Sequence, residues 1–227
     1  MTQTIGSFTG IKNEVQWVGF NIMSWLPHLA EMIFFDGDST DGTVELIEYI
    51  QKHIEGGERI KLFKGQDPKD LKDDYVRVWD ECLKQVKSDY ALYIHPDMIL
   101  TGWPRGLKLG GLAYTTKIRS FAGEPLGELF EFSEGRTDRW KNLMSNSLGL
   151  HYDGHYGAAY EDMYFRDITG DDHTLYPNMN SYPYEVKESG IELNHYSDVR
   201  PYSRRLGRMV SCLMNQHPGC HVAVAGS

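Results

Sequence analysis

The sequence has few basic residues, few cysteines and no long apolar run. Its 23 Lys and Arg against 32 Asp and Glu give a formal net charge of -9. A nucleic-acid binder needs a basic face, so we expect no nucleic-acid partner. The cysteines Cys82, Cys212 and Cys220 are too scattered for a disulfide framework, which favours a reducing compartment. No segment is apolar and long enough to span a bilayer, and no signal-peptide pattern opens the chain. We therefore expect a cytoplasmic protein without a transmembrane segment, and peripheral membrane association stays open.

Strand-like and helix-like patterns alternate over residues 1–100. Apolar runs typical of strands occupy residues 4–11, 31–36, 59–63 and 89–94. Apolar residues at helical spacing occupy 15–26, 44–51 and 75–87. In the first of these helices we expect Pro27 to end the helix and the buried face to consist of Val15, Val18, Ile22, Met23 and Leu26. This order predicts an α/β fold in which a parallel sheet carries helices on its faces. The length of 227 residues favours one domain spanning 1–227.

The second predicted strand ends abruptly in acids, in the stretch "IFFDGDSTDGT". Asp36 is its last residue, and Asp38 and Asp41 follow. Ligands of open parallel sheets bind beyond the carboxyl ends of the strands, so these acids are candidates for a site. Asp41 is predicted to cap the following helix. For Asp36 we favour a binding role, because a carboxylate on a buried strand is costly unless something uses it.

The fourth predicted strand also ends directly in polar residues, since "ALYIHPDM" runs from apolar residues into His95 and Asp97. An imidazole and a carboxylate one residue apart can together bind a divalent cation. Proline and aspartate also favour turns, so an ordinary strand-ending turn is the alternative.

These segments together resemble the nucleotide-sugar-binding half of family 2 glycosyltransferases of the GT-A fold. "IKNE" is similar to the family's Asn-Glu after the first strand. "FDGDSTDGT" resembles its "VDDGSTDGT" signature, with Gly37 and Asp38 where Asp and Gly are usual. "YVRVWDECLKQVKSDYALYIHPD" resembles the segment that ends in the family's DxD motif. The resemblance implies a Rossmann-like, mostly parallel sheet flanked by helices, with the nucleotide-sugar half in 1–100 and a smaller acceptor-side region in 101–227.

The resemblance also implies roles for individual residues. Asp36 would hydrogen-bond the base, Arg77 would help to hold the nucleotide, and Asp97 would bind a Mn²⁺ or Mg²⁺ that bridges the diphosphate. A carboxylate-lined site repels phosphate, so the cation is needed between them. The implied nucleotide-binding residues are Asn13, Glu14, Asp36, Asp38 and Arg77.

Two further segments resemble the family in the second half of the chain. "YEDMYFRD" holds Glu161 and Asp162, similar to an acidic pair in many family members, and the resemblance favours Asp162 as the base toward the acceptor hydroxyl. The alternative is a solvated helix face. "ELNHYSDV" resembles a late strand whose histidine can complete the metal shell, which makes His195 a metal candidate beside His95 and Asp97. A hydrogen-bonded structural histidine is the alternative there.

The resemblance therefore implies an inverting glycosyltransferase. It would move a sugar from a nucleoside-diphosphate sugar to a hydroxyl acceptor, either a glycan or a lipid-linked acceptor, with Mn²⁺ or Mg²⁺ assisting. Two other functions stay open. One is a non-catalytic nucleotide- or glycan-binding module. The other is a sugar-phosphate nucleotidyltransferase, although "TGIKNE" is a poor version of the glycine-rich basic loop that such enzymes usually carry.

Overall fold

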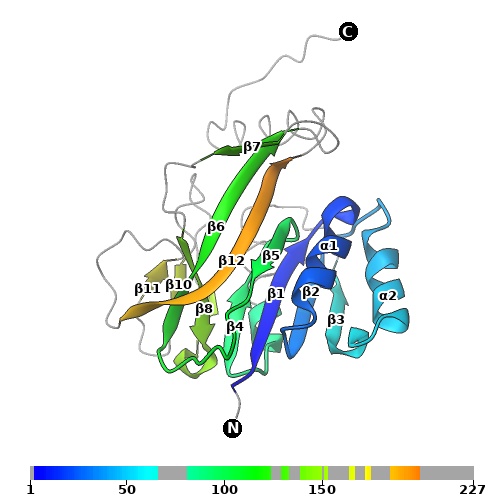
Figure 1. Ribbon diagram of the computed structural model, residues 1–227. Coiled ribbons are helices and arrows are strands. Elements are labelled where there is room, and N and C mark those ends of the chain that lie inside the picture. Colours follow the sequence, from blue (N-terminus) through cyan, green and yellow to red (C-terminus); the bar gives the residue numbers. More distant parts are fainter. Residues whose placement is uncertain are drawn as a thin grey trace, which may run out of the picture.

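The computed structural model describes residues 3–65, 81–123, 129–132, 139–149, 151–152, 164–166, 172–174 and 185–199. Within these residues, one sheet has the strand order β3-β2-β1-β4-β8-β6-β12-β5, and β7 pairs with β6 beside this path. Figure 1 shows the long strands β6 and β12 running side by side across the molecule, with α1 and α2 grouped at the β1–β3 side.

The first part of the sheet is parallel. Its strands β1 (Ile5–Ile11), β2 (Glu31–Asp36), β3 (Ile60–Lys64) and β4 (Tyr90–Tyr93) lie in the order β3-β2-β1-β4. The helices α1 (Val15–Trp25) and α2 (Thr43–His53) connect the first three of them, with a short 3-10 helix η1 (Gly57–Arg59) before β3. Residues 81–85 are helical, which agrees with the predicted helix 75–87, and its first part lies outside the described residues. The predicted alternation of strands and helices is confirmed.

Helical residues cover both faces of this parallel part. On β2, Met32 and Phe34 belong to the same core cluster as the buried residues of α1 and α2. Ile33, between them, points to the opposite face and packs in a second cluster with Cys82 and Leu83. Alternate residues of a strand point to opposite faces, so a strand buried on both sides is apolar throughout. This explains why "EMIFF" has no polar alternation.

Antiparallel strands extend the sheet beyond β4. β8 (Arg139–Ser145) pairs antiparallel with both β4 and β6 (Ala113–Gly123), and β7 (Leu129–Phe132) pairs antiparallel with β6. β12 (Val186–Val199) runs parallel to β6 and antiparallel to β5 (Met98–Gly102). A 3-10 helix η2 (Asn146–Leu148) follows β8. A separate sheet joins the short strands β9 (His151–Tyr152), β10 (Tyr164–Arg166) and β11 (Asp172–Thr174).

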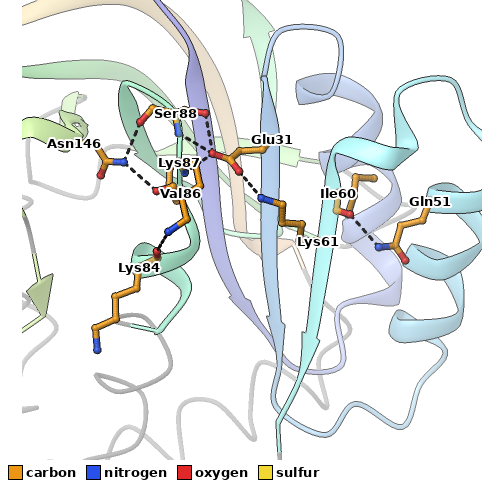
Figure 2. Close-up of polar contacts among 9 residues, drawn as sticks. All are labelled: Glu31, Gln51, Ile60, Lys61, Lys84, Val86, Lys87, Ser88 and Asn146. Carbon is orange, nitrogen blue, oxygen red and sulfur yellow. Dashed lines mark hydrogen bonds and ion pairs between the residues drawn. The ribbon is translucent and has the colours of Figure 1, made fainter.

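Glu31 ties three strands together at the amino-terminal edge of the parallel part (Figure 2). Its Oε1 accepts hydrogen bonds from the backbone N–H groups of Lys87 (2.6 Å) and Ser88 (2.8 Å), and its Oε2 accepts from Lys61 Nζ at 2.8 Å. The side chain reaches Ser88 past Gly6 on β1, where a Cβ atom would stand 2.7 Å from Glu31 Cγ. A side chain at residue 6 would therefore displace Glu31 or Ser88.

The predicted helix over 15–26 forms, and it ends close to Pro27 as expected. Its buried face differs from the prediction. Val15 and Met23, which we expected on the apolar face, are 38% and 51% exposed, whereas Asn21 and Trp25 are fully buried. Among the residues that the structure describes, every helix is too short or too polar to cross a bilayer.

Candidate functional site

The carboxyl ends of β1, β2 and β4 meet at one edge of the sheet. Pairing of Ile11 with Asp36 and of Phe8 with Tyr93 aligns these ends. The strand order reverses between β1 and β4, since the chain first adds β2 and β3 on one side of β1 and then β4 on the other. Such a switch point is where open α/β sheets bind ligands. The loops that follow these strands therefore border the candidate site.

The loops after β1 and β2 are joined by side-chain hydrogen bonds. The backbone N–H groups of residues 13, 14 and 15 donate to Ser39 Oγ (2.8 Å), Thr43 Oγ1 (2.8 Å) and Asp41 Oδ2 (3.1 Å). The first N–H groups of a helix have no partner within it and need such acceptors. The "STDGT" stretch, which follows β2, thus caps the start of α1, which follows β1.

Asp41 caps both helices. Besides Val15, its carboxylate accepts from the backbone N–H of Thr43, the first residue of α2, at 3.0 Å, as predicted, although the residue at the N-cap position is Gly42. Burial alone would raise the pKa of Asp41, but the hydrogen bonds from Thr43 and Val15 outweigh it and lower the pKa below its usual value. The charged carboxylate is therefore the form that the fold stabilises.

Asp36 is buried, with 3% of its surface exposed. Its Oδ2 accepts from the backbone N–H of Ser39 at 3.0 Å, whereas its Oδ1 has no hydrogen-bond partner among the described residues. A buried carboxylate oxygen without a partner costs free energy, and most buried polar atoms in proteins have a hydrogen-bond partner. Asp36 therefore has an acceptor available for a ligand.

The other nucleotide-binding candidates that the structure describes lie around Asp36. Asn13 Oδ1 accepts from the Thr40 N–H at 2.8 Å, so its side chain closes the same pair of loops. Glu14 is buried at the start of α1. Asp38 is exposed, and its backbone has the left-handed φ of 64° that favours glycine. Arg77 lies outside the described residues.

His95 and Asp97 stand on a tight turn between β4 and β5. The Met98 N–H donates to the His95 carbonyl at 3.1 Å, with Pro96 and Asp97 at the two central positions. Proline is favoured at the first of these because its ring fixes φ. The turn expected as the alternative at "HPD" therefore exists, and it presents two of the candidate metal ligands.

β12 brings His195 to this turn. His195 is paired with Met98 across β5 and β12, and the Tyr196 N–H donates to the Asp97 carbonyl at 3.0 Å. His195 Nε2 lies 3.5 Å from Asp97 Oδ1, and the two residues are 5% and 2% exposed. One ligand atom from each of His95, Asp97 and His195 lies within 4.8 Å of the other two. The three predicted metal candidates are thus brought together.

The three side chains fit a divalent cation. Atoms that bind one cation at roughly 2.1 Å lie about 3 to 4.2 Å apart, so separations within 4.8 Å require small side-chain rotations only. Two imidazole nitrogens and one carboxylate oxygen form a donor set that suits Mn²⁺ and other transition metals better than Mg²⁺, which prefers oxygen.

Sequence reasoning missed the residues that support this site. Asn21 on α1 donates its side-chain amide to the carbonyls of His95 and Met98, at 2.9 and 2.8 Å. A signal was present, because Asn21 falls at the helical spacing of the buried Val18 and Trp25. Nothing local in the sequence predicted the other support, which is the packing of Tyr196 against aromatic rings of α1 and β6.

Tyr196, beside His195, lies in a stack of aromatic rings. Its ring stacks on Trp17 of α1 with centroids 5.0 Å apart and on Phe121 of β6 at 5.3 Å. These contacts fix the end of β12 between a helix and a neighbouring strand. The catalytic candidates Glu161 and Asp162 lie outside the described residues, so the structure does not place them.

Comparison with known proteins places the fold. No family profile matches the chain, and no curated sequence relative is found. Solved structures match it. A mannosyltransferase from Pyrobaculum calidifontis in complex with GDP-Man and Mn²⁺ has 11% sequence identity and a TM-score of 0.52, over 95% of this chain and 63% of that one. GalNAc-T7 with UDP, GalNAc and Mn²⁺ has 13% identity and a TM-score of 0.53, over 93% and 48%.

The chain has the GT-A fold. This confirms the predicted fold class, a sheet of Rossmann type flanked by helices. S. aureus TarS in complex with UDP also matches, at 12% identity and a TM-score of 0.38, over 55% of this chain. The chain spans less than two thirds of each of these proteins: 37% of TarS, 48% of GalNAc-T7 and 63% of the mannosyltransferase.

Proposed function

We propose that this protein is a metal-dependent glycosyltransferase. It transfers a sugar from a nucleoside-diphosphate sugar to a hydroxyl of a glycan or lipid-linked acceptor, with inversion at the anomeric carbon. The observation that carries the proposal is the cluster of His95, Asp97 and His195 at the switch point of a GT-A sheet, within 4.8 Å of one another. The solved neighbours that hold a sugar nucleotide or its products together with Mn²⁺ have this fold.

The nucleoside is held at the loops after β1 and β2. Asp36 offers its unpartnered Oδ1 as an acceptor for a base N–H or a ribose hydroxyl. Asn13, Glu14 and Asp38 border this position in the same loops. The phosphates of the nucleotide sugar cannot lie against these loops directly, because the carboxylates repel them. The diphosphate therefore extends along the edge of the sheet toward the turn after β4.

The cation is held by His95, Asp97 and His195, and we propose Mn²⁺ over Mg²⁺ because two of these donors are nitrogens. A cation bound there would supply positive charge to stabilise the diphosphate leaving group. The chain itself supplies a dry setting for the site, since Asp97 and His195 are both buried. Electrostatic interactions are stronger in such a setting than in water.

The acceptor hydroxyl must lose its proton as it attacks the anomeric carbon. By resemblance of "YEDMYFRD" we propose Asp162 as the base, with Glu161 beside it. Arg77 is proposed to contact the nucleotide on the same ground. These roles are supported by the sequence pattern alone.

A transfer assay tests the proposal. The protein is incubated with UDP-, GDP- and dTDP-sugars, Mn²⁺ and a panel of glycan and lipid-linked acceptors, and the new glycosidic bond is examined by NMR. We expect one donor to be consumed, with inversion, and Asp162→Asn to abolish transfer while nucleotide affinity is retained. Nucleotide binding without turnover on any acceptor would instead support the non-catalytic module. Synthesis of a sugar nucleotide from a sugar phosphate and a nucleoside triphosphate would support the nucleotidyltransferase.

A further inference from the structure

Asn21 occupies an unusual position for a polar residue. It lies on the buried face of α1, is fully buried, and has apolar neighbours on this face at Val18, Ile22 and Trp25. Burying an amide in such a setting costs free energy unless its polar atoms are used. Its Nδ2 donates to two backbone carbonyls, those of His95 and Met98, whereas its Oδ1 accepts no hydrogen bond from the described residues.

These two carbonyls belong to the two ends of the turn that carries the candidate metal ligands. The turn's own hydrogen bond joins the same residues, from the Met98 N–H to the His95 carbonyl. The amide of Asn21 therefore bridges the turn from outside, at 2.9 Å to one end and 2.8 Å to the other. Asp97 lies between these fixed ends, and its own carbonyl accepts from Tyr196 of β12.

Other side chains of α1 contact the same segment, but at one end only. Trp25 Nε1 donates to the Met98 carbonyl at 3.0 Å, and Ser24 Oγ accepts from the Leu100 N–H at 3.2 Å. Asn21 donates to the His95 carbonyl, at the other end of the turn, as well as to the Met98 carbonyl. Leucine would fill its space without a donor, and aspartate would place oxygens against two carbonyl oxygens.

We infer that Asn21 is a positioning residue for the metal site, holding the backbone of His95 and Asp97 in the register that lets both side chains meet His195. This inference rests on the proposed function, because it assumes that the three side chains bind a cation. Residues that orient metal ligands from outside the coordination sphere typically contribute about 10- to 100-fold to metal affinity.

Asn146 provides a matched control. Its Nδ2 also donates to two backbone carbonyls, those of Val86 (3.0 Å) and Ser88 (2.9 Å) (Figure 2). These carbonyls precede β4, at the end of that strand opposite to His95 and Asp97. Asn21→Leu and Asn146→Leu each remove one bridging amide. Both variants are expected to lower the thermal stability of the metal-free protein, but only one alters the turn at His95.

The experiment is a titration with Mn²⁺, alone and with saturating UDP or GDP. Calorimetry and the EPR signal of free Mn²⁺ measure the binding. We expect Asn21→Leu to weaken Mn²⁺ binding by about 10- to 100-fold and Asn146→Leu by less than about twofold. Asn21→Ser retains one donor in a smaller side chain and guards against misfolding of the leucine variant, with an intermediate loss expected. The absorption spectrum of bound Co²⁺ should also change in the Asn21 variants, because it reports ligand geometry.

The outcomes separate this inference from the function on which it rests. If the wild type binds Mn²⁺ and the Asn21 variants bind it as tightly, with the Co²⁺ spectrum of the wild type, the positioning role is wrong and the metal site stands. Equal losses in the Asn21 and Asn146 variants would also overturn it, since a general loss of stability would then be the cause. A wild type that binds no Mn²⁺ under any of these conditions would overturn the metal site and this inference together.

Discussion

The Nε2 atom of His195 lies 3.5 Å from the Oδ1 atom of Asp97, and both side chains are buried. The two residues come from opposite halves of the chain. Pairing of β12 with β5 places His195 opposite Met98, one residue after Asp97, and β12 is held in turn by β6. The candidate metal site is thus assembled by the antiparallel extension of the sheet as much as by the parallel half.

The first prediction concerns metal preference. Because two of the three donors are imidazoles, we expect Mn²⁺ and Co²⁺ to bind more tightly than Mg²⁺. His95→Asp replaces a nitrogen donor by oxygen. It should therefore lower the ratio of the Mg²⁺ dissociation constant to the Mn²⁺ dissociation constant. Calorimetry measures both constants, with His53→Asp, an exposed histidine on α2, as the control. An unchanged ratio in His95→Asp would show that His95 does not contact the cation.

The second prediction concerns the shared cap at Asp41. Asp41→Ala removes acceptors from the Val15 and Thr43 N–H groups and should lower the free energy of unfolding by about 1–2 kcal/mol. Asp41→Asn keeps one acceptor oxygen and should lose less. Urea denaturation at pH 7 measures both. Equal stability of Asp41→Ala and the wild type would contradict the capping role.

Much of this loop region was predictable from sequence, and part of it was not. The polar residues after β2 and β4 follow the rule that parallel sheets bind at their carboxyl ends, so Asp36, His95 and Asp97 were found as candidates. The sequence pattern did not reveal that Asp41 also serves α1, because that hydrogen bond joins separate loops. Local spacing describes a helix and its own cap, but not which other element lies beside it.

Helix α1 illustrates the same limit. Apolar spacing predicted the helix and its end, yet it assigned Met23 to the core and gave no role to Asn21. A buried polar residue is recognisable only when its partners are known, and the partners of Asn21 are backbone carbonyls 74 and 77 residues away in sequence. His195 was found through the resemblance, since strand pairing across the whole chain is what brings it to the turn.

The third prediction concerns pH and Glu31. Burial alone would raise the pKa of Glu31, but the hydrogen bonds from Lys61, Lys87 and Ser88 together lower it below its ordinary value of 4.5. A carboxyl whose pKa is lowered on folding stabilises the fold above its unfolded pKa, and that stability is lost as pH falls through the folded pKa. Glu31→Gln should therefore unfold about 1–3 kcal/mol more easily at pH 7, with a smaller difference below pH 4.5.

Glu48→Gln is the control for this experiment. Glu48 pairs with Lys64 at 2.6 Å, but both side chains are exposed, so its loss should cost about 1 kcal/mol or less. Thermal or urea unfolding across pH 3 to 8 measures both variants. A Glu31→Gln deficit that stays constant over this range would contradict the assigned pKa shift.

The fourth prediction concerns Asp38, whose φ of 64° is a left-handed conformation that costs energy for a residue with a Cβ atom. The related signature has glycine at this position. Asp38→Gly should raise the free energy of unfolding by up to about 1 kcal/mol, whereas Asp38→Ala removes the carboxylate but keeps the strain. If Asp38→Ala raises the free energy of unfolding as much as Asp38→Gly does, loss of the charge is the cause and the strain argument is wrong. Nucleotide affinity of the two variants also tests the proposed contact of Asp38 with the ligand.

The most direct test of the account is calorimetric titration of UDP, GDP, dTDP and CMP into the wild type and into Asp97→Asn, each with and without Mn²⁺. We predict that one nucleoside diphosphate binds the wild type in a Mn²⁺-dependent manner, and that Asp97→Asn removes this dependence because the negative charge of the buried carboxylate ligand is lost. Nucleotide binding of equal affinity with and without the metal in the wild type would contradict the role of His95, Asp97 and His195. Absence of binding by every nucleotide in every condition would contradict the proposed function itself.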